Sequence, residues 1–380
     1  MHPLLRPSLR RAWRDLNTVQ FGITPGLAQV LSPVSTATGT FLTLLDGTRG
    51  LPLLREEARR MGLPEGHADE VVRRLAAAGL LDDATGGGLA AAALRGRPAL
   101  LDRLRPDLAA LSLGDPDPDS GIAGLGTRLG RHVQVRGAGR VGALLAAVLA
   151  AAGVGHVDVR DGGEVEPWDT APGGHPPQDV GHRRDESARA GARRAAPDRP
   201  SAPAPSTGEA GLGLVVLAPR DGLGAWAPHP SATADLVAAG TPHLHVGVIE
   251  RTGVVGPLVL PGTTGCAGCL DLHRVDRDPA WPRMLAQWRS GRQRHVVGGE
   301  VALTTTVAGH AAAQALAFLG GTPPGATGAR WEVSAPGFDW RRARVRPHPH
   351  CPCGAARHGD RQAGGTRATV DGEGRATMSG

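Results

Sequence analysis

The first 84 residues carry short apolar runs, separated by polar breaks, that predict a small mixed module. Two β-prone runs, Thr18–Ile23 and Gln29–Leu31, come first. Three stretches follow in which apolar residues recur at helical spacing, near Thr36–Leu45, Leu51–Met61 and His67–Ala78. A glycine follows each of these stretches closely, as is common where helices end. Strands followed by three short helices favour a winged-helix-like α+β module over residues 1–84.

The pattern then changes twice along the chain. Residues 85–130 are predicted to be a linker and helical connection, because Gly86-Gly87-Gly88 and Asp115-Pro116-Asp117-Pro118 interrupt the periodicity. Over residues 131–354, strand and helix patterns alternate, which predicts an α/β domain. Residues 195–211 are rich in Pro, Ala and Ser, and residues 355–380 lack periodicity, so both are expected to be disordered.

A glycine-rich loop joins a strand to a helix near the start of the α/β domain. The predicted strand His132–Arg136 runs into Gly137-Ala138-Gly139-Arg140-Val141-Gly142, and the helical stretch Ala143–Ala152 follows. A second predicted strand, Val154–Arg160, ends at Asp161. This strand–loop–helix–strand order is typical of a Rossmann-like nucleotide-binding unit.

Each glycine of the loop has a physical role in such a unit. Gly137 permits the tight turn, Gly139 lets the backbone approach a phosphate, and Gly142 allows close packing of helix on strand. The helix N-terminus adds free amides and a positive dipole end. Asp161 lies nineteen residues after Gly142, where a carboxylate accepts hydrogen bonds from a ribose. An ordinary turn residue at a strand end is the alternative for Asp161, and bound nucleotide is a separate question from the fold.

All four cysteines of the chain occur as two close pairs, Cys266 with Cys269 and Cys351 with Cys353. With 81 residues between the pairs, they match two knuckles that close one tetrahedral thiolate site, so structural zinc is predicted. A redox Cys-x-x-Cys is the alternative for the first pair, but it leaves the second pair unexplained. His348 and His350 flank the second pair, and we interpret them as solvent-facing loop residues rather than ligands.

Composition narrows the classes of function. All 42 basic residues among the 380 are arginine, which excludes any mechanism that needs a lysine ammonium. The net charge is +6, but the arginines are scattered and aromatic residues make up only 3%, so nucleic acid is not expected as a partner. Apolar runs fall short of a membrane span, and the N-terminus lacks a secretory h-region, so we expect a cytoplasmic protein without membrane association.

The order of motifs after residue 131 resembles the ThiF family, adenylyltransferases related to the ubiquitin-activating enzymes. The resemblance covers about Arg131–Gly354. It is carried by the glycine loop, the strand end at Asp161, Gly253–Pro257 leading into Pro261–Cys269, the alanine-rich Val301–Leu319, and His348–Gly354.

The N-terminal module resembles the PqqD-like domains that recognise leader peptides in ribosomal-peptide biosynthesis. The resemblance depends on Leu44–Thr48 and Ala77–Leu81. The combination is similar to ThiF-like partner proteins that deliver precursor peptides to azoline-forming cyclodehydratases, and ThiF relatives are typically homodimers. The peptide would add as a strand beside Gln29–Leu31, with Val30, Val71 and Arg74 as candidate contacts. Core packing of the valines and a solvated Arg74 explain the same residues equally well.

Active members of the ThiF family use ATP and magnesium to activate a C-terminal carboxylate as its acyl-adenylate. The family places an Asn and an Arg just after the ribose-binding strand, and Pro167–Gly174 contains neither. Arg184 stands where a phosphate-binding lysine is expected. Asp221 matches the metal-binding aspartate, after the strand Leu214–Ala218, only if the register shifts by one residue.

The first hypothesis is therefore a ThiF-like binding protein with a degenerate adenylation site, which presents a precursor peptide to a partner enzyme. The second is an active adenylyltransferase in which Asp161, Arg184 and Asp221 handle ATP. A nicotinamide-dependent oxidoreductase is disfavoured, because zinc knuckles fit that class poorly and the chain has neither lysine nor tyrosine. A catalytic cysteine is excluded if all four thiols bind zinc.

Overall fold

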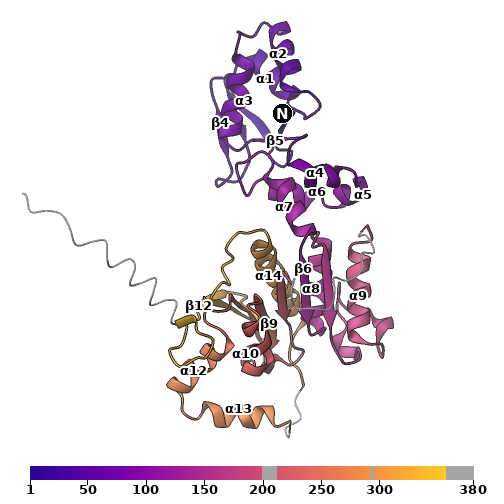
Figure 1. Ribbon diagram of the computed structural model, residues 1–380. Coiled ribbons are helices and arrows are strands. Elements are labelled where there is room, and N and C mark those ends of the chain that lie inside the picture. The colour runs from indigo at the N-terminus through magenta and orange to yellow at the C-terminus, as the bar shows by residue number, and fades with distance from the viewer. Residues whose placement is uncertain (199–211, 292–295, 357–380) are drawn as a thin grey trace, which may run out of the picture. The chain divides into compact units, whose positions relative to one another are not determined.

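The computed structural model describes residues 1–198, 212–291 and 296–356, and it divides the chain into two compact units (Figure 1). The first unit comprises residues 1–130, and the second begins at Arg131. The helices between residues 85 and 130 thus belong to the first unit. The predicted disordered segments fall largely outside the described residues, although 195–198 and 355–356 are described.

The N-terminal module of the first unit combines a three-stranded antiparallel sheet, ordered β2-β3-β4, with three helices. Its largest fully buried side chains include Phe41, Leu54 and Leu75. Strands β1 and β5 form a separate two-stranded antiparallel sheet. The elements are β1 (Pro3–Leu5), β2 (Arg11–Asp15), β3 (Thr18–Phe21), β4 (Gln29–Leu31), α1 (Thr36–Phe41), α2 (Leu51–Arg60), α3 (His67–Ala77) and β5 (Leu81–Asp83).

The predicted ranges of β3, β4, α2 and α3 agree with the structure to within two residues. The expected first helix ends earlier than predicted, since α1 stops at Phe41 and a 3₁₀ turn, Leu42–Leu44, follows. Strand β2 was not predicted, because all five of its residues are exposed and it has no buried alternate face.

Four helices complete the first unit with an apolar cluster of their own. Its buried members are Leu94, Leu100, Leu104 and Leu125. The helices are α4 (Gly88–Arg95), α5 (Pro98–Arg103), α6 (Arg105–Leu111) and α7 (Ser120–Leu129).

The second unit is built on a seven-stranded mixed sheet ordered β12-β11-β10-β9-β8-β6-β7. Strands β7, β6, β8 and β9 are parallel to one another, and β9 to β12 form an antiparallel continuation. The strands are β6 (His132–Arg136), β7 (His156–Arg160), β8 (Leu214–Leu217), β9 (His243–Ile249), β10 (Thr252–Val259), β11 (Ala329–Ser334) and β12 (Trp340–Arg344).

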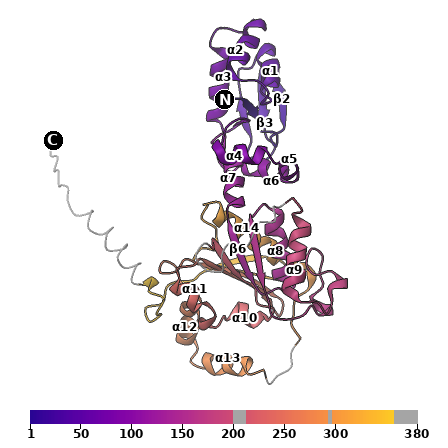
Figure 2. The same cartoon turned by 45° about the vertical axis from the view of Figure 1, so that its right-hand side comes forward.

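Helices cover both faces of this sheet. Val246 and Val248 of β9 share one apolar core with Leu303 and Val307 of α14, while a Cβ at Gly247, on the opposite face, would meet Ala225 of α10. Figure 2 shows α10, α11 and α12 on the other side of the sheet from α14. The helices are α8 (Arg140–Ala151), α9 (Arg184–Ala195), α10 (Gly222–Trp226), α11 (Ala234–Ala238), α12 (Ala267–Arg277), α13 (Trp281–Arg289) and α14 (Val301–Leu319).

Helix α14 is long and apolar enough to cross a membrane by length and composition alone, and it alone passes that test among the described helices. Eight of its side chains are nevertheless buried within the unit. Its packing against α8, β9 and β10 is that of a core helix in a globular domain.

The glycine loop enters its helix sooner than the sequence predicts. Helix α8 begins at Arg140, directly after Gly139, rather than at Ala143. The carboxyl ends of the parallel strands β6, β8 and β9 meet at one edge of the sheet, next to this helix start. In open α/β sheets, ligands bind at this edge.

Candidate nucleotide site and cysteine cluster

The glycine loop is held by contacts too close for any side chain at two positions. Gly137 has φ +103°, and a Cβ there would lie 2.1 Å from the carbonyl oxygen of Ala218. A Cβ at Gly142 would lie 2.0 Å from the carbonyl oxygen of Gly137. At Gly139 the nearest neighbour is instead the side chain of Arg220, with its Cγ 3.1 Å away. Gly139 therefore faces a cation that the sequence analysis did not identify.

Asp161 holds the glycine loop through hydrogen bonds from the backbone. Its Oδ2 accepts from the N–H of Ala138 at 2.8 Å, and its Oδ1 accepts from the N–H of Gly163 at 2.9 Å. Arg184 donates to the same Oδ1 at 3.0 Å. Burial by itself would raise the pKa of Asp161, but these hydrogen bonds and the Arg184 charge hold it below its usual range. The carboxylate is thus ionised and already engaged by the protein.

Arg184 is the start of a chain of alternating charges. Its Nη1 lies 3.6 Å from Oδ2 of Asp169, and Nε of Arg220 lies 2.7 Å from Oδ1 of the same carboxylate. Arg220 also pairs with Glu166. We call these five residues, Asp161, Arg184, Asp169, Arg220 and Glu166, the ion-pair chain. The central Asp169 side chain is only 3% exposed, so water screens its two pairs poorly.

Three members of the ion-pair chain, Glu166, Asp169 and Arg220, were missed by sequence reasoning. Asp169 falls in the Pro167–Gly174 stretch, where only the absence of Asn and Arg was noted. Arg220 lies 51 residues further on, after strand β8. The parallel order of β6 and β8 brings the two segments together at one sheet edge. One feature of the sequence could have identified Arg220: like the glycine loop, it follows the carboxyl end of a strand in the parallel part of the sheet.

A hollow of about 90 Å³ lies at this edge of the sheet. Its lining includes Gly139, Arg140, Trp168, Asp169 and Arg220. It is small beside the roughly 300–1,000 Å³ of ordinary ligand pockets. Nη1 of Arg140 donates to the carbonyl oxygen of Gly299 at 2.9 Å, so this cation too has a protein partner.

Asp221, the candidate for binding magnesium, lies apart from the glycine-loop hollow. It is the N-cap of α10, where its Oδ1 accepts from the N–H of Leu223 at 3.0 Å. It is absent from the residues that line the glycine-loop hollow and lines a neighbouring hollow instead.

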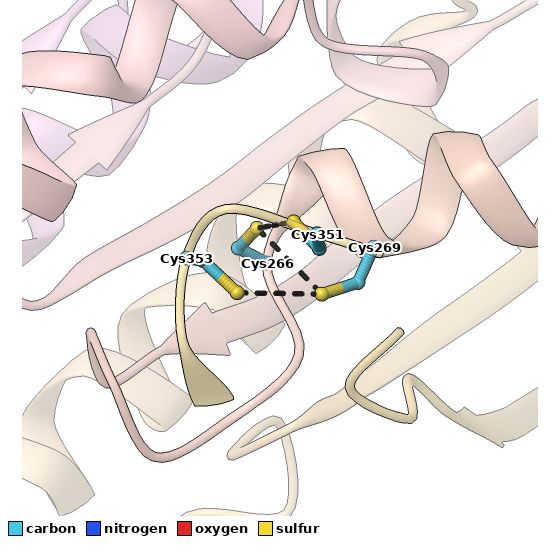
Figure 3. Close-up of side chains that lie close together, drawn as sticks. All are labelled: Cys266, Cys269, Cys351 and Cys353. Carbon is cyan, nitrogen blue, oxygen red and sulfur yellow. Dashed lines mark hydrogen bonds between the residues drawn. The ribbon is translucent and has the colours of Figure 1, made fainter. Parts of the chain in front are cut away.

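The four cysteines come together in one cluster, although the pairs are far apart in the chain (Figure 3). Cys266 and Cys269 lie at the start of α12, and Cys351 and Cys353 follow β12. The Sγ–Sγ separations are 3.9 Å for Cys266–Cys269, 3.6 Å for Cys266–Cys351 and 3.5 Å for Cys269–Cys353. All are too long for a disulfide, which needs about 2.05 Å.

The donor set fits a tetrahedral metal ion. Four thiolates at about 2.3 Å from zinc would lie about 3.8 Å from one another, which is close to the observed spacing. Burial raises the pKa of the Cys351 thiol to about 12, and the hydrogen bond that Cys266 donates to Cys269 raises the pKa of Cys266 above its usual range. Four thiols this close ionise together only if a cation compensates their charge. Zinc would supply no catalysis in such a closed site, but would tie α12 to the segment after β12.

The prediction that His348 faces solvent is wrong. The residue is only 3% exposed. Its Nε2 lies 2.9 Å from Oδ2 of Asp276, and its Nδ1 accepts from the N–H of His350 at 3.2 Å. Both ring nitrogens are therefore occupied, and the ring joins α12 to the second cysteine pair. His350 is exposed, as expected.

The candidate peptide contacts lie in the first unit. Val30 is 52% exposed on β4, an edge strand of its sheet. Arg74 of α3 reaches the same edge, since its Nη2 donates to the carbonyl oxygen of Ser32 at 2.9 Å. Val71 is 3% exposed and belongs to the core. Val30 and Arg74 thus lie at the β4 edge of the sheet, whereas Val71 is a core residue of the same unit.

Strand order, glycine loop and helix placement define the second unit as a Rossmann-like α/β domain with a mixed sheet. A model of the ThiF family matches residues 123–207. No curated protein sequence matches the chain.

Solved structures match nearly the whole chain at low identity. MccB from E. coli in complex with ATP is 15% identical, with a TM-score of 0.63 over 93% of this chain and 99% of that one. MccB with MccA-N7isoASN is 15% identical, with a TM-score of 0.63 over 93% and 100% of the two chains. PaaA is 18% identical, with a TM-score of 0.66 over 89% and 98%. These similarities show that the chain shares the fold of MccB and PaaA.

Proposed function

We propose that this chain is a ThiF-like scaffold that binds the leader of a precursor peptide and presents it to a cyclodehydratase-type enzyme in ribosomal-peptide biosynthesis. In this proposal the first unit is a PqqD-like, winged-helix-like recognition module, and the adenylation site of the second unit is degenerate. The solved structures of MccB with a precursor peptide, MccA, support peptide binding by this architecture. The ion-pair chain is the observation that favours a scaffold over an enzyme.

Adenylyl transfer needs free cations at the phosphates, and here the cations are engaged. Arg184 and Arg220 share Asp169, and each has a further carboxylate partner. An ATP tail carries about four negative charges, so it would have to displace these carboxylates or bind beside them. Removing one group that stabilises such a transition state costs roughly 3 kcal/mol or more. Loss of several should therefore abolish the chemistry while leaving weak nucleotide binding at the helix N-terminus.

Pyrophosphate exchange into ATP tests the degenerate site. We expect the purified full chain to exchange no faster than a Gly139→Asp variant, with or without peptide. ATP binding alone decides nothing, since a scaffold can bind nucleotide for stability. Peptide-dependent exchange that Arg184→Ala abolishes would overturn the proposal.

An active adenylyltransferase is the second candidate, with ATP and magnesium as cofactors and Arg184 and Asp221 in catalysis. It is favoured by one observation, the presence of Arg140 and Arg220 in the hollow beside Gly139. Gly137, Gly139, Gly142 and Asp161 would then position the nucleotide.

The open edge of β4 supports peptide capture by strand addition. Such an edge presents unpaired backbone N–H and C=O groups that an extended peptide can complete. The half-exposed Val30 and the Arg74 guanidinium beside it offer apolar and charged contacts along the same edge. Val71 would act indirectly, by holding α3 against the sheet.

Titration of the full chain with candidate leader peptides tests this surface. We expect Val30→Asp to weaken binding at least about tenfold, because it places a desolvated charge at the added strand. Leu16→Asp makes the same change at a side chain that is 90% exposed in the turn between β2 and β3, and should leave affinity within about twofold. Equal loss in both variants would contradict strand addition at β4.

We further propose that the cysteine cluster binds one structural zinc per chain and that the chain forms a homodimer in the cytoplasm. The zinc proposal is supported by the Sγ spacing, and native mass spectrometry measures metal content and oligomeric state together. Partly buried Leu144 and Val148, beside a hollow of about 810 Å³ near α8 and α9, offer an apolar surface that a second copy can cover.

A further inference from the structure

A second hollow, of about 490 Å³, opens beside the glycine-loop hollow. The two share Val248, Val297 and Gly298 as lining residues. Tryptophan side chains from α10 and α13 form its walls, and carboxylates lie among them. We call it the tryptophan hollow and define it by Trp226, Trp281, Trp288, Asp221 and Glu250.

The tryptophan walls are held in place by hydrogen bonds. Nε1 of Trp281 donates to Oδ1 of Asp271 at 2.8 Å. Arg289, at the end of α13, donates to the carbonyl oxygen of Ala227 at 2.7 Å, which ties α13 to the end of α10. The rings of Trp281 and Trp288 pack edge to face, with centroids 5.7 Å apart. Rings fixed in this way need little reordering when a ligand binds.

Two of the three tryptophan rings that line the hollow already pack against a guanidinium group of the protein. The guanidinium carbon of Arg330 lies 4.0 Å from the ring centroid of Trp226, and that of Arg274 lies 4.9 Å from the centroid of Trp281. Both arginines are buried and come from outside the hollow's lining. Trp288 has no such partner among the described contacts and is 46% exposed.

The charge of the hollow is opposite to that of the chain. Asp221 and Glu250 are the only charged residues among the described lining residues, and both are carboxylates. The whole chain, by contrast, carries a net charge of +6. An acidic, aromatic hollow in a basic protein is complementary to a cation, because aromatic faces and carboxylates both stabilise positive charge.

We propose that the tryptophan hollow binds a basic side chain, arginine or lysine, of a peptide that this protein handles. The cation packs against Trp288 and is neutralised by Glu250 and Asp221, which fixes the peptide next to the glycine-loop edge. The proposal rests on the proposed function only in assigning the cation to a peptide. In this proposal the second unit recognises one basic side chain of the peptide, at a site separate from the edge of β4 in the first unit.

Binding of small probes to the full chain tests this site without a leader. N-acetylarginine amide and N-acetyllysine amide should bind saturably, measured by tryptophan fluorescence and calorimetry, and at least about fivefold more tightly than N-acetylleucine amide. Trp288→Leu should weaken arginine-probe binding about tenfold, consistent with a cation–π contact in a partly desolvated site. Trp288→Phe should retain most of the affinity.

Charge variants complete the experiment. Glu250→Gln should weaken binding of the arginine probe about fivefold, whereas Glu186→Gln, a matched change at an exposed site in the same unit, should have no effect. Equal affinity for the leucine probe would overturn the proposal in favour of a purely apolar pocket. Since the probes carry no leader, failure at the β4 edge would leave these results unchanged.

Discussion

The ion-pair chain at the glycine loop and the cysteine cluster are two groups of ionisable residues in the second unit, and they differ in how their charges can be compensated. At the glycine loop, carboxylates and guanidiniums alternate along the ion-pair chain, and each buried charge has a partner of the opposite sign. At the cysteine cluster, four acidic groups of one kind crowd within 4.8 Å of one another. Protein groups therefore compensate the charges of the first site, whereas the thiols of the second would need a cation from solution to ionise together.

This difference in charge compensation predicts which of the two sites depends on a bound ligand for its stability. A site that compensates its own charges folds without a ligand, and a ligand must then displace a protein partner or bind beside it. A cluster of thiols gains its stability from the ion, so binding energy there is folding energy. Mutations at the two sites should consequently have unequal effects on stability and on ligand content.

The largest expected effect comes from Cys353→Ser or Cys266→Ser. Each should abolish stoichiometric zinc and with it soluble protein, since structural zinc contributes on the order of 10 kcal/mol to folding of small domains. Metal analysis and yield of soluble protein measure both outcomes. His350→Ala, at an exposed neighbour, serves as the control. Soluble wild-type protein with substoichiometric zinc, or with a disulfide, would contradict the assignment.

An intermediate effect is expected from Asp169→Asn, which removes the shared partner of Arg184 and Arg220. We expect the free energy of unfolding in urea to fall by about 2–4 kcal/mol, as for loss of one member of a buried ion pair. The same change should raise ATP affinity, because Arg220, beside Gly139, and Arg184 lose the carboxylate that they share. Glu186→Gln, at an exposed pair, should cost less than about 0.5 kcal/mol. Unchanged ATP affinity in Asp169→Asn would show that the ion-pair chain does not restrain the hollow.

The smallest effect concerns acid pH. The pKa of Asp161 is lowered in the folded state, so its ionised form stabilises the fold above its unfolded pKa, and this contribution is lost as pH falls through the folded value. The difference in free energy of unfolding between wild type and Asp161→Asn should be about 1–2 kcal/mol near pH 6. It should shrink as pH falls below about 4. A difference that stays constant with pH would mean that Asp161 acts through shape rather than charge.

Local patterns in the sequence were sufficient for the elements around the glycine loop, for α14 and for part of the first unit. Helices α3 and α14 and strands β4 and β6 have the predicted bounds to within one residue, because each buries a regular apolar face or run. Strands β1, β2 and β5 were missed, since they are short and β2 has no buried face, and no bounds were predicted for β9 to β12 or for α9 to α13. The start of α8 was predicted too late, because a charged residue, Arg140, and a poor helix former, Gly142, interrupt the apolar helical pattern in its first turn.

The sequence by itself determined the α/β character of the second unit, the glycine loop and the cysteines as one set. Spacing and residue type carry those features, and both are local properties of the chain. Only the tertiary structure revealed the partners of Arg184, the role of Arg220, the burial of His348 and the tryptophan hollow. Each of these depends on which strands lie side by side and on which side chains meet at the edge of the sheet. Contacts between residues such as Asp169 and Arg220, 51 positions apart, have no local signature, because the sheet's strand order brings them together.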